Sequence, residues 1–272
     1  MPEGHTLHRL AIDHRRELAG GPVSTSSPQG RFAEEAARLD ERVLVDVDAY
    51  GKHLFYDFGG GDVVHVHLGL LGRFFRHDPP PPPPRDTVRL RMSGLHATVD
   101  LVGATECALI DPALQDAIVG RLGPDPIRRD ADPDRAWAKL QRRKTPIGAA
   151  LMDQSVVSGV GNVYRAELLH VHRIHPEVPA NEITHEQWDA MWATLVRWLR
   201  RAVKDQVIIT VEPKLVGKPR SRIAKGEAVH VYKRDACFTC GGEVRRWDIS
   251  GRWAYACERC QRPPGARSGR SV

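Results

Sequence analysis

The sequence has no long hydrophobic segment and only five cysteines in 272 residues. No apolar run approaches the roughly 18 residues of a membrane-spanning helix, and the opening MPEGHTLHRL turns polar and basic too early for a secretory signal. We therefore expect a cytoplasmic protein with no membrane partner. Because the cytoplasm keeps thiols reduced, paired cysteines there indicate a metal site rather than a disulfide.

Charge is unevenly distributed along the chain. The formal net charge is +6, but residues 200–272 hold 17 Lys and Arg against 7 Asp and Glu, and the rest holds 23 against 27. A basic C-terminal quarter on a slightly acidic body is typical of a surface that binds nucleic acid. A solvated basic tail is the alternative. The length suggests two or three structural units.

The first part of the sequence predicts one helix followed by strands. Leu7, Leu10, Ala11 and Leu18 recur at helical spacing from about residue 4 to residue 18. Short β-type runs follow, with a tight connection at Gly59–Gly61 and an extended loop at the proline run Pro79–Pro84. The predicted strands are Val43–Val47, His53–Phe58, Val63–Leu68, Val88–Met92 and His96–Val102.

The second part of the sequence predicts helices and then a cysteine module. Pro133 and Pro146 can each open a helix, and a longer helix carries Trp188, Trp192, Leu195, Leu199 and Val203 on one face. Residues 213–228 have the composition of a mobile linker, and the tail from Arg262 that of a disordered segment.

The strongest chemical motif is Cys237-x2-Cys240-x16-Cys257-x2-Cys260. Four thiolates at this spacing suit one tetrahedral zinc on a β-hairpin, and they leave no open position for a catalytic water. The zinc is therefore expected to be structural. The same segment carries arginines and aromatic residues that suit phosphate contact, although a purely stabilising module is the alternative. These residues are Arg245, Arg246, Trp247, Arg252, Trp253, Tyr255 and Arg259.

A glycine-containing turn, SGVGN at Ser158–Asn162, interrupts two predicted helices. The exposed N–H groups and dipole at the start of the second helix suit a DNA phosphate, and Asn162 could add a donor. A purely structural turn explains the glycines equally well. Cys107, in the apolar segment ECALI, is expected to be a buried small side chain.

The N-terminal PEGHT offers a nucleophile. Removal of Met1 would leave Pro2 as a secondary amine, whose reference pKa near ~8 keeps a useful fraction unprotonated at neutral pH. Attack on a sugar C1′ gives an iminium ion that makes the C2′ hydrogen removable. The adjacent Glu3 could protonate the sugar ring oxygen.

Taken together, these motifs resemble the formamidopyrimidine-DNA glycosylase/endonuclease VIII family. The resemblance runs from PEGH to CERCQ through GKHLF, HLGLLGRF, RLGPDP, LMDQSVVSGVGNVYRAELL and VYKR, in that order. It implies an α+β chain: an N-terminal β-sandwich with flanking helices at 2–115, a helix–two-turn–helix domain at 128–212 and a zinc-finger hairpin at 229–262. Residues 263–272 are expected to form a disordered tail.

The resemblance also implies the site. Pro2 matches the Schiff-base nucleophile, Glu3 the general acid, and Lys52 a phosphate-binding lysine credited with proton transfer. Arg252 matches the zinc-finger arginine that grips the lesion's phosphates. Leu70 matches the wedge that fills the gap left by base flipping. Asn162 and Arg121 match further DNA contacts, and Cys237, Cys240, Cys257 and Cys260 match the ligands of one structural Zn²⁺.

The implied function is a bifunctional DNA glycosylase and AP lyase of base excision repair, acting as a nucleoid-associated monomer on damaged double-stranded DNA. Gly4 resembles the endonuclease VIII branch and favours oxidised pyrimidines. Two residues depart from the pattern: His5 stands where members of the family often carry a second glutamate, and Gly69-Leu70-Leu71 stands where some endonuclease VIII proteins carry Gln-Leu-Tyr. His65 and His67 are interpreted as sheet residues or phosphate contacts rather than metal ligands.

Three alternatives remain open. A purine-directed formamidopyrimidine or 8-oxoguanine glycosylase would share the same motifs. A non-catalytic zinc-ribbon nucleic-acid-binding protein would explain the cysteines and the basic quarter, but not PEGH or GKHLF. A family member that has lost its activity is the third.

Overall fold

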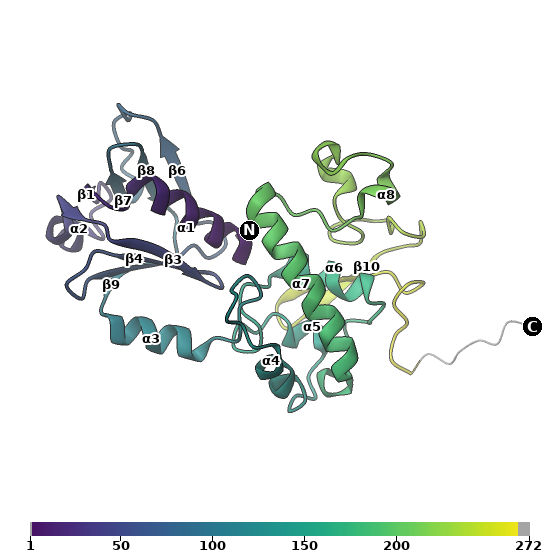
Figure 1. Ribbon diagram of the computed structural model, residues 1–272. Coiled ribbons are helices and arrows are strands. Elements are labelled where there is room, and N and C mark those ends of the chain that lie inside the picture. The colour runs from purple at the N-terminus through teal and green to yellow at the C-terminus, as the bar shows by residue number, and fades with distance from the viewer. Residues whose placement is uncertain (1, 266–272) are drawn as a thin grey trace, which may run out of the picture. The chain divides into compact units, whose positions relative to one another are not determined.

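A computed structural model describes residues 2–265, which divide into two compact units with their boundary between Leu122 and Gly123 (Figure 1). Within these residues no helix is both long enough and apolar enough to cross a membrane. Each unit is described separately below. Met1 and residues 266–272, most of the predicted disordered tail, lie outside the described residues.

The first unit contains two antiparallel β-sheets, which confirms the predicted sandwich. The five-stranded sheet has the order β2–β1–β7–β8–β6: Arg42–Val43, Pro22–Ser26, Val88–Ser93, Thr98–Val102 and Arg73–His77. The four-stranded sheet has the order β3–β4–β5–β9: Asp46–Tyr50, His53–Asp57, Val63–His67 and Glu106–Ile110. Cys107 is buried in β9, as expected, and burial raises the pKa of its thiol to about 12.

Both faces of the four-stranded sheet are buried. Leu54 and Tyr56 of β4 join the main core with residues of the five-stranded sheet, of α1 (Gly4–Leu18) and of α2 (Ala33–Leu39). Phe55, which alternates with them, packs in a second cluster with residues of α3 (Pro112–Arg121). Successive side chains of β4 therefore point to opposite faces of the sheet and pack in two different hydrophobic cores.

The predicted connections are confirmed, but several elements were missed. Gly59, Gly60 and Gly61 all have positive φ in the turn between β4 and β5, and the proline run lies between β6 and β7 outside any helix or strand. Five elements were not predicted: β1, α2, β6, β9 and α3. One strand was predicted at Val43–Val47, where the structure has β2 and β3 in different sheets. Their pairing with different partners, β1 and β4, explains the break.

The second unit begins with four helices around one core: α4 (Pro133–Leu140), α5 (Ile147–Ala150), α6 (Asn162–Val171) and α7 (His185–Asp205). The longest helix, α7, starts with a capping box between Thr184 and Gln187. Its Trp188 is fully buried and donates from Nε1 to the carbonyl oxygen of Pro133 at 2.9 Å. A short 3₁₀ turn at Ala180–Glu182 precedes this helix.

The segment predicted as a mobile linker instead forms short turns: α8 (Pro213–Val216) and 3₁₀ turns at Arg220–Arg222 and Lys225–Glu227. Arg220 pairs with Asp205 of α7 at 2.7 Å, and Lys218 pairs with Glu227 at 2.6 Å. These ion pairs give the segment a local structure, which its composition alone did not indicate. The chain then forms the hairpin of β10 (Arg245–Ile249) and β11 (Arg252–Ala256), which packs on α6.

Candidate functional site

The N-terminal residues lie at the start of α1. Glu3 occupies the N-cap position with extended backbone, its carbonyl oxygen accepts from the Thr6 N–H at 2.8 Å, and its side chain is fully buried. Burial lowers the pKa of the nearby His5 to about 4, so that imidazole is neutral near pH 7. The helix thus presents Pro2 beside a buried carboxyl group.

Pro2 shares a cavity of about 400 Å³ with the loop between β5 and β6. The other lining residues are Thr6, Leu70, Leu71, Gly72 and Arg73. Leu70 and Leu71 are 53% and 79% exposed, which is unusual for two adjacent leucines in a packed domain. The structure therefore brings the predicted nucleophile and the predicted wedge to one cavity.

Glycines hold this loop in its tight form. Gly69 has φ +64°, and a Cβ there would lie 1.9 Å from Thr105 Oγ1. A Cβ on Gly72 would lie 2.2 Å from the carbonyl oxygen of Leu68. The departure at Gly69 thus has a local explanation: Thr105 fills the space that a side chain at position 69 would need.

Lys52 lies in the turn between β3 and β4, beside a group of histidines on β4 and β5. His53 Nδ1 lies 2.9 Å from His65 Nε2, and His67 Nδ1 accepts from the N–H of Gly69 at 3.2 Å. Burial, then the neighbouring histidines, then Lys52 and Arg121 lower the pKa of His53 to about 3. Burial likewise lowers the pKa of His67, so this ring is neutral while it orders the wedge loop.

The predicted glycine turn precedes α6 and is held by a residue that the sequence analysis did not single out. Gln154 accepts from the N–H of Gly159 at 3.0 Å and donates to the carbonyl oxygen of Val160 at 3.0 Å. Gly159 has φ +83°, so glycine suits this position. Gly123 packs against the same turn, since a Cβ there would lie 2.2 Å from the carbonyl oxygen of Val156.

Asn162, the first residue of α6, is turned toward the hairpin. Its Nδ2 donates to the carbonyl oxygen of Trp253 at 3.1 Å, and the buried Arg165 donates to the same oxygen at 2.7 Å. Arg165 also donates to Oδ1 of Asn162. An amide has two N–H groups, so the bond to Trp253 leaves one of them for another acceptor.

Arg252 starts β11 at the exposed end of the hairpin. Asp248 accepts from the Gly251 N–H at 3.0 Å and so closes the turn before it. The sequence analysis missed Arg165, although its charge inside an otherwise apolar helix face was a signal. Arg121 is also exposed, at the end of α3, where its Nε donates to the carbonyl oxygen of Ala117 at 3.1 Å.

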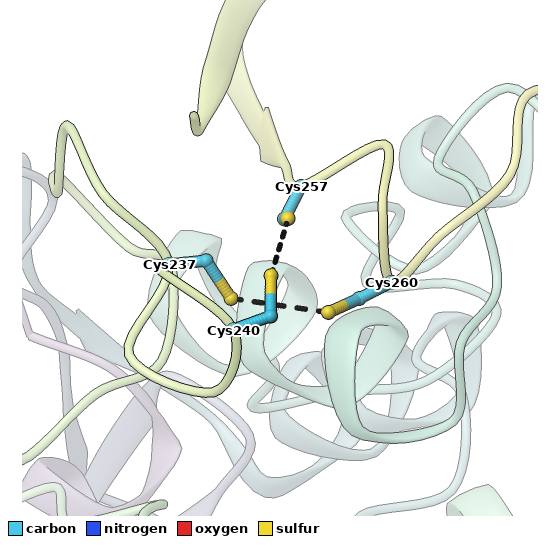
Figure 2. A group of neighbouring side chains, drawn as sticks. All are labelled: Cys237, Cys240, Cys257 and Cys260. Atoms are coloured by element: carbon cyan, nitrogen blue, oxygen red, sulfur yellow. Dashed lines mark hydrogen bonds between the residues drawn. The ribbon is translucent and has the colours of Figure 1, made fainter. Parts of the chain in front are cut away.

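The four predicted cysteines converge, with their sulfur atoms within 4.8 Å of one another (Figure 2). A tetrahedral ion with Zn–S bonds of ~2.3 Å would hold its sulfurs about 3.8 Å apart. The Cys237–Cys260 and Cys240–Cys257 separations are 4.0 Å and 3.5 Å. The cluster therefore suits a tetrahedral metal ion.

Polar residues around the cysteines fix the two knuckles. The fully buried Gln261 accepts from the N–H of Cys257 at 3.2 Å and donates to the carbonyl oxygen of Ile174 at 2.8 Å. The hydrogen bond from the Gly242 N–H is the main cause that lowers the pKa of Cys240 to about 7, whereas burial raises the pKa of Cys237. An ion that binds thiolates would take the protons from both.

A second buried carboxylate ties the hairpin module to α6. Glu167 accepts from the backbone N–H groups of His230, Val231 and Tyr232 at 2.6–2.8 Å, and from the hydroxyl of Thr210 at 2.6 Å. Its side chain is fully buried. This role of Glu167 was not predicted, because its carboxylate binds backbone N–H groups of residues more than 60 positions away in the sequence.

Two family models match the chain. Residues 1–112 match the formamidopyrimidine-DNA glycosylase N-terminal domain, and residues 122–212 match the formamidopyrimidine-DNA glycosylase H2TH domain. Endonuclease 8 1 of Mycobacterium tuberculosis is 47% identical over 267 residues, which cover 96% of this chain and 100% of that protein. The chain belongs to the formamidopyrimidine-DNA glycosylase/endonuclease VIII family. The predicted family is thus confirmed, and with it the enzyme class, a DNA glycosylase with AP lyase activity.

Other relatives come from both branches of this family. A formamidopyrimidine-DNA glycosylase of Thermomicrobium roseum is 29% identical and covers 96% of the chain and 98% of that protein. The fold is similar to that of the Lactococcus lactis formamidopyrimidine-DNA glycosylase bound to DNA with an AP site, with a TM-score of 0.76 and 21% identity over 96% of this chain and 100% of that one. The same enzyme bound to DNA containing an oxidised pyrimidine gives 0.77 and 20% over the same shares.

Proposed function

We propose that this glycosylase and AP lyase removes oxidised pyrimidines from double-stranded DNA and cleaves the strand by β,δ-elimination, with Pro2 as its nucleophile. The supporting observation is the position of Pro2, which lines a cavity with Leu70 and directly precedes the buried Glu3. A secondary amine needs no other group to form an iminium ion, and a carboxyl group shielded from water suits proton donation.

The proposed reaction has two stages. The Pro2 nitrogen attacks C1′, the bond to the base breaks with its electron pair going to the base, and the proton that the Pro2 nitrogen loses goes to the departing base. The sugar ring then opens as Glu3 protonates the ring oxygen, which leaves an iminium ion. The resulting iminium draws electrons from the C2′–H bond, so loss of that proton expels the 3′ phosphate. A second elimination expels the 5′ phosphate, and hydrolysis of the remaining iminium frees Pro2.

The remaining residues are proposed to hold the DNA. Lys52 would bind a phosphate beside the lesion and carry a proton during β-elimination, and Arg252 would grip the lesion's phosphates from the hairpin. Leu70 would enter the base stack, where an apolar side chain offsets part of the cost of unstacking. Asn162 and Arg121 would contact further phosphates, and the N-terminus of α6 supports such a role for Asn162.

We propose one structural Zn²⁺ bound by Cys237, Cys240, Cys257 and Cys260. The sulfur separations and the absence of a fifth ligand among the described residues of this cluster support it. The ion would supply folding energy to the hairpin and take no part in bond breaking. The division into 2–115, 128–212, 229–262 and 263–272 remains our proposal for the domains, as does a nucleoid-associated monomer in the cytoplasm.

The pyrimidine preference rests on Gly4 and on the 47% identity to an endonuclease 8. The purine-directed alternative is tested by comparing excision from duplexes that contain 5-hydroxyuracil, thymine glycol or 8-oxoguanine. Faster excision of both pyrimidine lesions is expected. Faster excision of 8-oxoguanine would reverse the assignment.

The nucleophile is tested by borohydride trapping on DNA with an abasic site. The native chain should be trapped through its N-terminal residue, and mass spectrometry should show that Met1 is absent. Pro2→Gly keeps an α-amine, so partial trapping is expected there. Full trapping of protein whose N-terminus is chemically blocked, or activity of protein that retains Met1, would exclude Pro2.

A further inference from the structure

One face of the cysteine hairpin carries a groove that the proposed reaction does not use. Its volume is about 840 Å³, within the roughly 300–1,000 Å³ of ligand sites. It is lined by Lys233, Arg234, Asp235, Glu243, Val244, Arg245, Arg246, Trp253 and Tyr255. All of these residues belong to the second unit.

Strand register places aromatic and basic side chains together on this face. Arg246 pairs with Tyr255 and Asp248 pairs with Trp253, so Trp253 and Tyr255 point to the same side of the hairpin. Tyr255 is buried and its ring meets Tyr232 edge-on, with centroids 5.2 Å apart. Tyr255 therefore forms the floor of the groove and Trp253 its wall.

Trp253 is the exposed tryptophan of this chain. Its side chain is 56% exposed, whereas the other five tryptophans are buried or half-buried. An exposed indole loses favourable burial unless a ligand covers it. The backbone of the same residue is fixed by Asn162 and Arg165, so the ring stands on a rigid support.

The charges of the groove favour an anion. Four cations face two carboxylates, and within the described part of the chain neither Lys233 nor Arg246 forms an ion pair. Arg245 is paired with Glu258 at 2.7 Å. Arg234 lies over the ring of Phe238, and Lys233 lies over the ring of Tyr232. A ring contact does not neutralise the charge of Lys233, so Lys233 and Arg246 can bind phosphates beside the aromatic wall.

We infer that this groove binds an unpaired stretch of DNA strand, with a nucleobase stacked on Trp253 and neighbouring phosphates on Lys233 and Arg246. Aromatic stacking next to cations is how proteins hold single strands without reading their sequence, because every base has a π-face. A duplex keeps its bases stacked inside and offers no such face. The inference rests on the proposed function, since removal of the damaged nucleotide leaves the nucleotide opposite the gap unpaired.

The test uses the full-length, zinc-loaded protein. Tryptophan fluorescence reports stacking on Trp253 in the native chain, and the anisotropy of dye-labelled DNA measures the affinity of every variant, including those without this indole. The probes are an oligothymidylate of about ten nucleotides, a blunt duplex with an abasic site, and the same duplex with a single-stranded tail of that length. The oligothymidylate should quench the emission, and the tailed duplex should bind more tightly than the blunt one. The comparison of these probes shows whether the groove binds a free single strand or a single strand that is attached to the duplex substrate.

The variants assign the effect to the groove. Trp253→Ala should weaken oligothymidylate binding about tenfold, while Trp253→Phe should retain most of the affinity. Lys233→Ala and Arg246→Ala should each reduce, by about 0.7, the slope of log binding constant against log salt concentration. Lys214→Ala, which removes an exposed lysine from α8, is the matched control and should change neither the affinity nor this slope.

Wild-type affinity in Trp253→Ala would overturn the inference. So would equal binding of poly-glutamate, which would show that charge alone suffices, and so would quenching by the blunt duplex without any by the oligothymidylate. Borohydride trapping of every variant on the blunt duplex is measured in parallel. Failure of trapping in the wild type would count against the proposed nucleophile and leave the groove result readable by itself.

Discussion

The β-sandwich and the cysteine hairpin hold their functional residues by different physical means. Pro2 and Leu70 are positioned by a sandwich whose main core draws on both sheets and on α1. The hairpin rests on a small cluster that includes Val231, Val244 and Tyr255 together with cysteines of the metal site itself. Packing alone can stabilise the first region, whereas the small cluster of the second is where the proposed zinc would add folding energy.

Removal of the metal should give the largest difference between the two regions. Structural zinc contributes roughly 10–16 kcal/mol in isolated fingers, so Cys257→Ser or a strong chelator should unfold the hairpin and leave the sandwich folded. Hydrogen exchange should show loss of amide protection in β10 and β11 and retention in β4 and β5. Cys107→Ser is the control, because it removes a buried thiol outside the cluster and should leave the bound zinc unchanged. Protected hairpin amides in metal-free protein would contradict the comparison.

Glu3→Gln tests the chemical role of the sandwich site. Base excision should fall by about 10²–10⁴, because proton donation by a positioned acid contributes that much. Cleavage at a preformed abasic site should fall less, since the base has already left. Single-turnover assays on both substrates measure the difference, with the exposed Glu34→Gln of α2 as the control. Equal loss on both substrates would show that Glu3 has another role.

Glu167→Gln tests how the hairpin module is fixed to α6. The amide would place an N–H group against donors that now bind a carboxylate, at a cost of about 3 kcal/mol. Urea denaturation should show this loss in the second unit alone. Glu177→Gln, at an exposed position, should change the free energy of unfolding by less than about 0.5 kcal/mol.

Gly69→Ala tests the wedge loop and has a matched control in Gly61→Ala. Both glycines have positive φ, but a Cβ at Gly61 meets no atom within 4 Å, whereas one at Gly69 overlaps Thr105. We expect a loss of about 1 kcal/mol for Gly61→Ala and about 2–3 kcal/mol for Gly69→Ala. The added change Thr105→Gly should recover the difference. Equal losses for the two alanine variants would contradict the overlap.

A single histidine of the group on β4 and β5 should give the smallest effect, measured over one pH unit as a pH dependence of sandwich stability. Burial lowers the folded-state pKa of His53 to about 3 and of His65 to about 4, so the unfolded chain binds more protons below pH ~6.5. The contribution of these histidines to the free energy of unfolding should be fully present above that pH and should be lost progressively toward pH 4. Lys52, Arg121 and Glu106 are the charged groups that act on this group, and the buried His5 and His14 add to the same trend.

His65→Asn should reduce the slope between pH 6 and pH 5 by about 1 kcal/mol per unit. Denaturant titrations across this range measure it. An unchanged slope would show that His65 titrates alike in the folded and unfolded states.

The sequence was sufficient where local chemistry alone dictates the structure. The helical spacing of Leu7, Ala11 and Leu18, the glycines at Gly59–Gly61 and the four cysteines each appear in the structure as predicted. The short strands were missed because β6 exposes most of its residues and exists through its pairing with β8. Helix α3 buries no residue fully, so its sequence has no apolar stripe to recognise.

The candidate site follows the same division. Pro2, Leu70 and the cysteines could be named from motifs, and the structure shows which of them share a cavity or cluster. Gln154 and Glu167 could not be predicted, because each acts through backbone atoms, and Arg165 offered only its charge in α6 as a signal. A sequence reports side-chain chemistry well and reports poorly which main-chain atoms will need a partner.

The joint between α6 and the hairpin rests on a main-chain oxygen, the carbonyl of Trp253. Every amino acid supplies that acceptor, so replacement of the side chain leaves the joint intact. A substitution at position 253 can therefore change the side chain that lines the proposed strand-binding groove. The attachment of the hairpin to α6 stays the same.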